Sequence, residues 1–81
     1  MSRDEIYLKL TSVFHEVFDN DNIALSDGMS AEDVDEWDSL SHIRLVVAVE
    51  EMFSIRFDSS DVVELENVGQ FVDLIGSKSN G

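Results

Sequence analysis

Apolar residues recur at helical spacing in the first stretch of the chain. They lie on one face of a helix, at Ile6, Leu10, Val13, Phe14 and Val17. Ser2 and Glu5 have the spacing of a capping box, in which each side chain accepts a hydrogen bond from the other residue's backbone amide. The run Asp-Asn-Asp-Asn at 19–22 competes for backbone hydrogen bonds. We therefore expect a first helix that ends near residue 19.

No apolar period holds between this helix and residue 37. Ile23, Leu25, Met29 and Val34 are isolated among polar residues, so we expect a long loop that is held to the core at separate points. Gly28 supplies a turn in this loop, and residues 30–33 predict one short helical turn. A loop of this length is uncommon in so small a domain and usually has a functional reason.

Residues 39–53 predict a second long helix, with Asp38 as its N-cap. Its apolar residues cover two faces. The face that we assign to the core carries Leu45, Val46, Val49, Met52 and Phe53. The other face carries Leu40, Ile43 and Val47 beside charged residues, which is typical of a helix that binds a partner. The alternative, in which other helices surround this one on all sides, fits the pattern equally well.

Two further elements complete the pattern. Residues 59–65 predict a short segment with Val62 and Leu65 facing inward. Asn-Val-Gly-Gln at 67–70 has the form of a second capping box and opens a last helix, whose apolar face carries Val68, Phe71, Val72 and Ile75. The predicted fold class is all-α: a small four-helix bundle of three longer helices and one short one, with a long loop between the first two helices.

Length and composition narrow the possible functions. A chain of 81 residues buries roughly 60–65% of its unfolded surface, enough for one core but no deep cleft. There is no cysteine, which excludes disulfides, thiolate metal sites and a cysteine nucleophile. No apolar run approaches a membrane span, and the N-terminus does not resemble a signal peptide. We expect a monomeric cytoplasmic domain over residues 1–75, followed by a flexible C-terminal tail at 76–81.

The charge is strongly acidic. Eighteen acidic residues against five basic ones give a net charge of −13, which opposes binding to nucleic acid and attracts basic surfaces. Several carboxylates gather around the second helix, namely Asp33, Asp35, Glu36, Asp38, Glu50 and Glu51. Charge alone would also fit a small protein-interaction module that binds a basic enzyme without covalent modification, with Ser39 serving only the helix N-terminus.

Catalytic and metal-binding patterns are weak. Asp38, Ser39 and His42 contain the groups of a hydrolase triad, but one helical turn would point them outward with no nucleophile elbow and no enclosed site. The run 19–22 starts like a calcium loop, yet Ile23 and Ala24 occupy the positions of an oxygen ligand and the glycine. We therefore expect no enzyme and no metal site. What remains is the Ser39 hydroxyl, where a phosphodiester would lie near the positive end of the helix dipole.

These features resemble the acyl carrier protein family over nearly the whole chain. Asp38-Ser39-Leu40 is similar to the family's attachment motif, and residues 46–55 are similar to its second helix and exit. Val62, Leu65, Val68 and Phe71 fall where the third and fourth helices of the family place core residues. The resemblance implies that a phosphopantetheinyl transferase moves the phosphopantetheine arm from coenzyme A onto Ser39. Acyl groups would then be carried as thioesters on the thiol of the arm.

The resemblance also implies how partners bind. Acyl-loading and acyl-processing enzymes with basic docking surfaces would contact the second helix. The contacts would be the apolar Leu40, Ile43 and Val47 and the charged Arg44, Glu50 and Glu51. The run 36–42 looks more like carriers of specialised pathways, such as polyketide-like, lipid-modifying or amino-acyl-loading systems. Within it, Trp37 either covers the core or sets specificity, and His42 either contacts the phosphodiester or is an ordinary surface residue.

Overall fold

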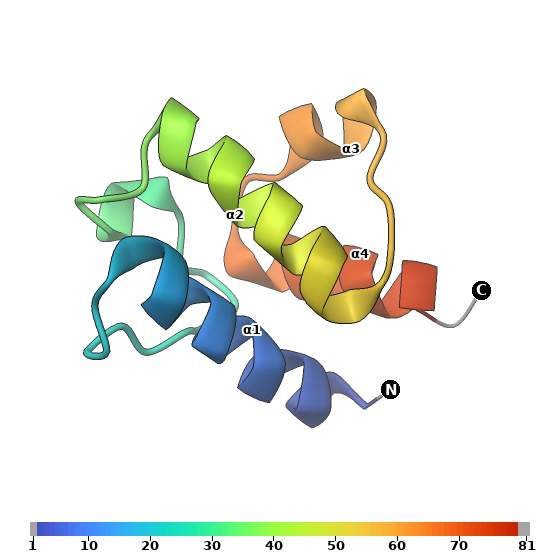
Figure 1. Cartoon of the computed structure of the whole chain (residues 1–81), viewed down its shortest axis with the longest axis horizontal. Helices are drawn as coiled ribbons and strands as arrows, with labels where there is room; N and C mark the ends of the chain where they lie inside the picture. Colours follow the sequence, from blue (N-terminus) through green and yellow to red (C-terminus); the bar gives the residue numbers. More distant parts are fainter. Residues whose placement is uncertain (1, 80–81) are drawn as a thin grey trace.

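The computed structural model describes residues 2–79. In chain order its elements are α1 (Arg3–Phe18), the 3-10 turn η1 (Ala31–Asp33), α2 (Ser39–Phe53), α3 (Ser59–Glu64) and α4 (Val68–Ser79). Helices α1 and α2 lie side by side and run in opposite directions, and α1 also packs against α4 (Figure 1). The predicted all-α bundle of three longer helices and one short one is confirmed, as is the long loop between α1 and α2.

Local capping sets the ends of α1. The Ser2 hydroxyl accepts a hydrogen bond from the Glu5 amide at 3.2 Å, which is the serine half of the predicted capping box. At the other end Asp19 adopts a left-handed backbone conformation with φ of 51°, and its N–H donates to the carbonyl of His15. Aspartate tolerates this conformation better than most residues. The acidic and amide run therefore ends the helix where the sequence predicted.

The core is formed by one face of each long helix together with three loop residues. Its buried members are Ile6, Leu10, Val13, Phe14, Phe18, Met29, Val34, Trp37, Leu45, Val46, Val49, Phe53, Val68, Phe71, Val72 and Ile75. Half-buried side chains, including Val62 and Leu65 as predicted, pack against this core. No polar or charged residue among the described residues 2–79 is buried. The hydrophobic effect therefore holds the three long helices together.

Met52 departs from the predicted core. Its side chain is 42% exposed. At about 100° per residue it lies on the edge of the buried face of α2, on the side of Ala48 rather than of Val46. The assignment of Met52 to the core was therefore wrong.

The long loop is fastened to the first turn of α4. The amide of Val68 donates to the carbonyl of Met29 at 2.8 Å, and the amide of Gly69 donates to the carbonyl of Asp27 at 2.9 Å. These two amides begin α4, where no carbonyl of the preceding helical turn is available. The loop therefore caps α4, and its apolar residues are held in the core at separate points as predicted.

The predicted capping box at the start of α4 is present in a modified form. The Asn67 side-chain oxygen accepts from the Gln70 amide at 2.8 Å. The Gln70 side-chain oxygen accepts from the amide of Glu66, one residue before Asn67, also at 2.8 Å. The reciprocal bond thus reaches further back along the connection from α3.

The structure differs from the flexible tail expected at 76–81. Helix α4 continues to Ser79, and residues 80–81 lie outside the described part of the chain. The Lys78 ammonium lies 3.1 Å from a carboxylate oxygen of Asp61 in α3 and 5.9 Å from the centre of the Phe57 ring. The sequence pattern could not show these contacts, because Asp61 lies in α3 and Phe57 lies before α3. Both reach Lys78 only when the helices pack.

Within residues 2–79, no helix is both long and apolar enough to cross a bilayer.

Candidate functional site

Asp38 and Ser39 lie where the long loop meets α2. Asp38 is the N-cap: its carboxylate accepts from the Ser41 amide at 2.9 Å, and its carbonyl accepts from the His42 amide at 2.8 Å. The hydrogen bond from Ser41 lowers the pKa of the Asp38 carboxyl group. Ser39 is the first residue of the helix and is exposed. The local sequence therefore holds the Ser39 hydroxyl at the surface on a fixed helix N-terminus.

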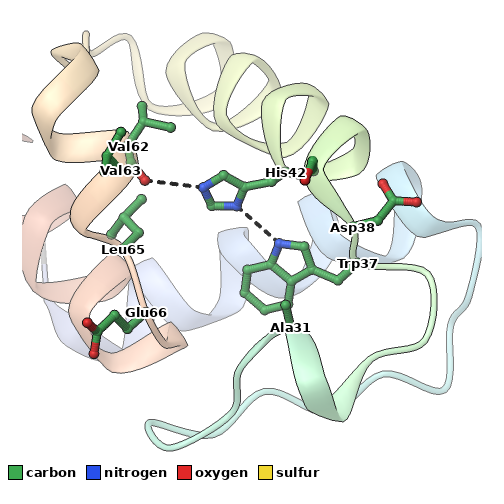
Figure 2. A pocket seen from close by; sticks show the side chains of 9 residues that line it. Ala31, Trp37, Asp38, His42, Val62, Val63, Leu65 and Glu66 are labelled. Atoms are coloured by element: carbon green, nitrogen blue, oxygen red, sulfur yellow. Dashed lines mark hydrogen bonds between the residues drawn. The ribbon is translucent and has the colours of Figure 1, made fainter.

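A groove of about 530 Å³ opens beside this serine. Its lining comes from the loop, α2, α3 and the segment after α3: Ala31, Trp37, Asp38, Ser39, His42, Val62, Val63, Leu65 and Glu66 (Figure 2). The lining combines apolar side chains with two carboxylates and an imidazole. This groove, named here the α2–α3 groove, is the concave surface next to Ser39.

Trp37 forms the inner wall of the α2–α3 groove. Its side chain is only 8% exposed and meets Phe14 edge-on, with the ring centres 5.3 Å apart. The Phe18 ring also lies near the indole ring, with the ring centres 6.2 Å apart. This agrees with the first of the two roles considered for Trp37, that of an aromatic residue that covers the core. Aromatic pairs in this arrangement add stability beyond their buried area.

His42 is not the ordinary surface residue that was one of the two roles expected from the sequence. It is half-buried, and its Nδ1 accepts a hydrogen bond from Trp37 Nε1 at 3.1 Å. Its Nε2 lies 3.4 Å from the carbonyl oxygen of Val62 in α3. His42 therefore joins α2 to the loop and to α3, a role that sequence spacing could not show because Val62 lies twenty residues further on.

The second face of α2 is open to solvent. Leu40, Ile43 and Val47 are 69%, 59% and 47% exposed. The alternative in which neighbouring helices surround α2 is therefore wrong. Exposed apolar residues that lie together are a common feature of surfaces that bind other proteins.

A second groove, of about 720 Å³, extends this stripe towards α1. Its lining is Val13, Glu16, Val17, Ile43, Arg44, Val47, Ala48, Glu51 and Met52. We name it the α1–α2 groove. Sequence reasoning missed the contribution of α1 here, because only the packing of the two helices shows which residues of α1 face α2.

The two glutamates expected on this surface differ. Glu50 is half-buried, and its carboxylate accepts from the Phe57 amide at 2.9 Å. Glu51 is exposed and lines the α1–α2 groove. Glu50 thus ties the end of α2 to the connection that leads to α3, whereas Glu51 is available to a partner.

Within residues 2–79, no group of three or more histidine, cysteine, aspartate or glutamate side chains is placed to hold a metal ion.

Comparisons with known proteins cover nearly the whole chain. The phosphopantetheine attachment site family matches residues 9–75. An acyl carrier protein from Acidothermus cellulolyticus is 34% identical over 77 residues, which is 95% of this chain and 92% of that protein. One from Lactobacillus johnsonii is 26% identical over 80 residues, covering 99% of this chain and all of that protein.

The fold of this chain is similar to that of a solved structure. The solution structure of the holo acyl carrier protein from Geobacter metallireducens has a TM-score of 0.84 and 43% sequence identity, and the match covers 89% of this chain and 83% of that one. The region matched by the family, residues 9–75, contains both grooves and the start of α2.

Proposed function

This chain belongs to the acyl carrier protein family, and we propose that its phosphopantetheine arm is attached to the hydroxyl oxygen of Ser39. Members of the family are carriers and not catalysts. The covalently attached phosphopantetheine supplies a terminal thiol, on which acyl groups are held as thioesters. This chain has no cysteine, so every thiol that it presents comes from the arm.

The position of Ser39 carries the proposal. Its hydroxyl is exposed at the first residue of a 15-residue helix, and it has no hydrogen-bond partner among residues 2–79. A phosphate attached there lies at the helix N-terminus, where backbone N–H groups and the helix dipole favour negative charge. The α2–α3 groove begins at the same residue and offers the arm a partly apolar surface. The residues present therefore fit the group.

Attachment requires a second protein. We propose that a phosphopantetheinyl transferase joins the Ser39 oxygen to the phosphate of the arm and breaks the bond from that phosphate to the adenosine bisphosphate half of coenzyme A. The proton of the hydroxyl group leaves with this step. The net charge of −13 attracts a transferase with a basic surface.

We further propose that partner enzymes bind the exposed stripe of α2 together with the α1–α2 groove. Leu40, Ile43 and Val47 supply the apolar contacts, and Glu51 and Arg44 supply the charged ones. The groove adds Met52 of α2 and Glu16 of α1 to the residues expected from the sequence. Acyl-loading and acyl-processing enzymes with basic docking surfaces fit this pattern.

The extent and state of the carrier are also proposals. The domain expected over 1–75 includes the remainder of α4, because Lys78 is paired with Asp61. Like charge on every copy opposes self-association, so the carrier works as a monomer. We place it in the cytoplasm, where coenzyme A supplies the arm.

Intact mass tests the attachment site. The chain is incubated with coenzyme A and a broad-specificity phosphopantetheinyl transferase, and its mass is recorded. We expect a gain of one phosphopantetheinyl group in the wild type and in Ser41→Ala, and no gain in Ser39→Ala. A gain in Ser39→Ala would show that another residue is modified. No gain in folded wild type would favour the small acidic interaction module without covalent modification.

Partner kinetics test the docking surface. Val47→Glu places a charge in the exposed stripe, whereas Leu8→Glu places one on α1 at a residue that is 73% exposed and lines neither groove. We expect kcat/KM of an acyl-loading enzyme to fall about tenfold with Val47→Glu, equal to ~1.4 kcal/mol, and to change little with Leu8→Glu. Equal effects of the two variants would remove the stripe from the proposal.

A further inference from the structure

The residues on either side of Ser39 are joined by their side chains. Trp37 Nε1 donates to His42 Nδ1 at 3.1 Å, and the two rings stack with their centres 6.0 Å apart (Figure 2). The other ring nitrogen, Nε2, lies 3.4 Å from the carbonyl oxygen of Val62. This bridge connects the loop before α2, the first turn of α2, and α3.

The bridge requires one protonation state of His42. An indole N–H only donates, so Nδ1 carries no proton and accepts. A carbonyl oxygen only accepts, so the single proton of the neutral ring is on Nε2. The imidazolium form has N–H groups on both nitrogens, and its Nδ1–H would then face the indole N–H of Trp37. Protonation therefore removes the hydrogen bond between the two rings.

We propose that His42 is a positioning residue: its neutral form bridges Trp37 to α3 and sets the width of the α2–α3 groove beside Ser39, and its protonation opens that groove. The bridge itself is independent of the proposed attachment at Ser39. Its consequence for the arm rests on that attachment.

Packing shows which side of the bridge moves. Trp37 is held in the core by Phe14 and Phe18, whereas α3 has six residues and none of them is buried. Val63 in the same helix is 82% exposed. The imidazolium still donates from Nε2 to the Val62 carbonyl, so protonation breaks only the link to the indole, and the His42 ring and α3 then move together away from Trp37.

His42 shares the α2–α3 groove with two carboxylates. The carboxylates that share the groove are Asp38, from the loop, and Glu66, from the segment after α3. Phe14 and Phe18 are the residues of α1 that pack against Trp37, and neither carries a charge. A histidine imidazole changes charge between about pH 5 and pH 8. The two experiments therefore cover pH 5 to pH 8.

The first experiment uses NMR on the ¹⁵N-labelled chain before the arm is attached. We expect the proton on Nε2 of His42 at pH 8. On acidification, the indole N–H signal of Trp37 and the amide signals of α3 should change in one transition, at the midpoint of the His42 titration. A proton on Nδ1 at pH 8 would overturn the proposal. An indole signal that does not change at the midpoint of the His42 titration would overturn it as well.

The second histidine is an internal control. Nε2 of His15, in the last turn of α1, lies 2.8 Å from the carbonyl oxygen of Ile23. His15→Gln should leave the transition of the Trp37 indole unchanged. Loss of the transition in His15→Gln would show that His15, and not His42, causes the change in the indole signal.

Two variants separate hydrogen bonding from charge. His42→Gln retains an acceptor and a donor but does not titrate, so it should keep the indole signal in its pH 8 position down to pH 5. His42→Phe keeps a ring and loses both hydrogen bonds, so it should show the displaced α3 signals at every pH. A pH transition that persists in His42→Gln would contradict the proposal.

The second experiment observes the arm. Its phosphodiester does not titrate between pH 5 and pH 8, so its ³¹P signal reports on its surroundings. We expect this signal to follow the His42 titration in the wild type, to stay constant in His42→Gln, and in His42→Phe to lie near the acidic wild-type value at every pH. A His42→Phe signal at the neutral wild-type value would assign the change to imidazolium charge alone and overturn the link to groove width.

The failures of the two proposals are distinguishable. If no arm is gained in the mass measurement, the attachment at Ser39 fails while the NMR experiment on the unmodified chain still decides the bridge. If the arm is gained but the indole signal does not follow His42, the bridge fails and the attachment stands.

Discussion

Gly69 lies directly against the backbone of Asp27. Its amide donates to the Asp27 carbonyl at 2.9 Å, and a Cβ added to Gly69 would lie 3.0 Å from that oxygen and 3.2 Å from the Asp27 Cβ. This close approach fastens the long loop to the N-terminus of α4. The loop in turn carries Trp37 and ends at Asp38, so the contact supports the position of Ser39.

Gly69→Ala should therefore destabilise the protein. The added methyl group meets a backbone oxygen that cannot turn away, and overpacking of this kind costs about 1–3 kcal/mol. Gly28→Ala is the matched control, because a Cβ there meets nothing within 4 Å and its φ is not positive. Urea unfolding followed by Trp37 fluorescence measures both. Equal free energies of unfolding for the two variants would show that the contact relaxes without cost.

The Asp27 side chain predicts a dependence of stability on pH. Its carboxylate accepts hydrogen bonds from the Tyr7 hydroxyl and from Arg3, and these bonds lower its pKa. A group with a lowered pKa in the folded state stabilises the protein above its unfolded pKa of ~3.9 and loses this effect as the pH falls through the folded value. Asp27→Asn should therefore lower the free energy of unfolding at pH 7, and the difference from wild type should shrink below about pH 4.

Removal of one negative charge from a protein of net charge −13 by itself changes the free energy of unfolding. Asp35→Asn controls for it, since Asp35 is exposed and makes no hydrogen bond or ion pair within residues 2–79. The Asp27 prediction fails if both variants change the pH dependence of unfolding alike.

Trp37 should be a major source of stability. Trp37→Ala leaves a cavity against Phe14 and Phe18, and such a change costs about 3–5 kcal/mol. Trp37→Phe keeps an aromatic cover and loses the hydrogen bond to His42, so its cost should be smaller. Circular dichroism follows the unfolding of both variants, which lack the only tryptophan. A Trp37→Ala variant as stable as Trp37→Phe would show that the indole does not cover the core.

Glu50 and Glu51 should separate stability from partner binding. Glu50→Ala leaves the Phe57 amide without its acceptor and should cost about 1 kcal/mol of unfolding free energy. Glu51→Ala should leave stability unchanged and should raise KM for an enzyme with a basic docking surface. Thermal unfolding and partner kinetics of the two variants measure this. The reverse pattern would exchange the two roles.

The helix bounds followed from local sequence. Asp38 and the apolar period after it predicted α2 over residues 39–53, and the structure places the helix at Ser39–Phe53. The stop after Phe18 was predicted as well. Capping residues and helical period act between neighbours within about one turn, so the sequence contains the whole of this information. The motif at 38–40 is equally local, but the attachment at Ser39 is what the resemblance to the acyl carrier protein family over nearly the whole chain implies.

What the sequence left open depends on which helices meet. The period of α2 could not show that Met52 lines a groove with α1, or that Glu50 binds the Phe57 amide. The continuation of α4 to Ser79 is accompanied by the pairing of Lys78 with Asp61 in another helix. These contacts arise only when the elements pack, because burial and hydrogen bonding are decided by neighbours in space. The sequence by itself therefore determined the bounds of α1 and α2 and the residues of the motif. The tertiary structure decided how far α4 extends and which residues line the two grooves, because those depend on neighbours in space.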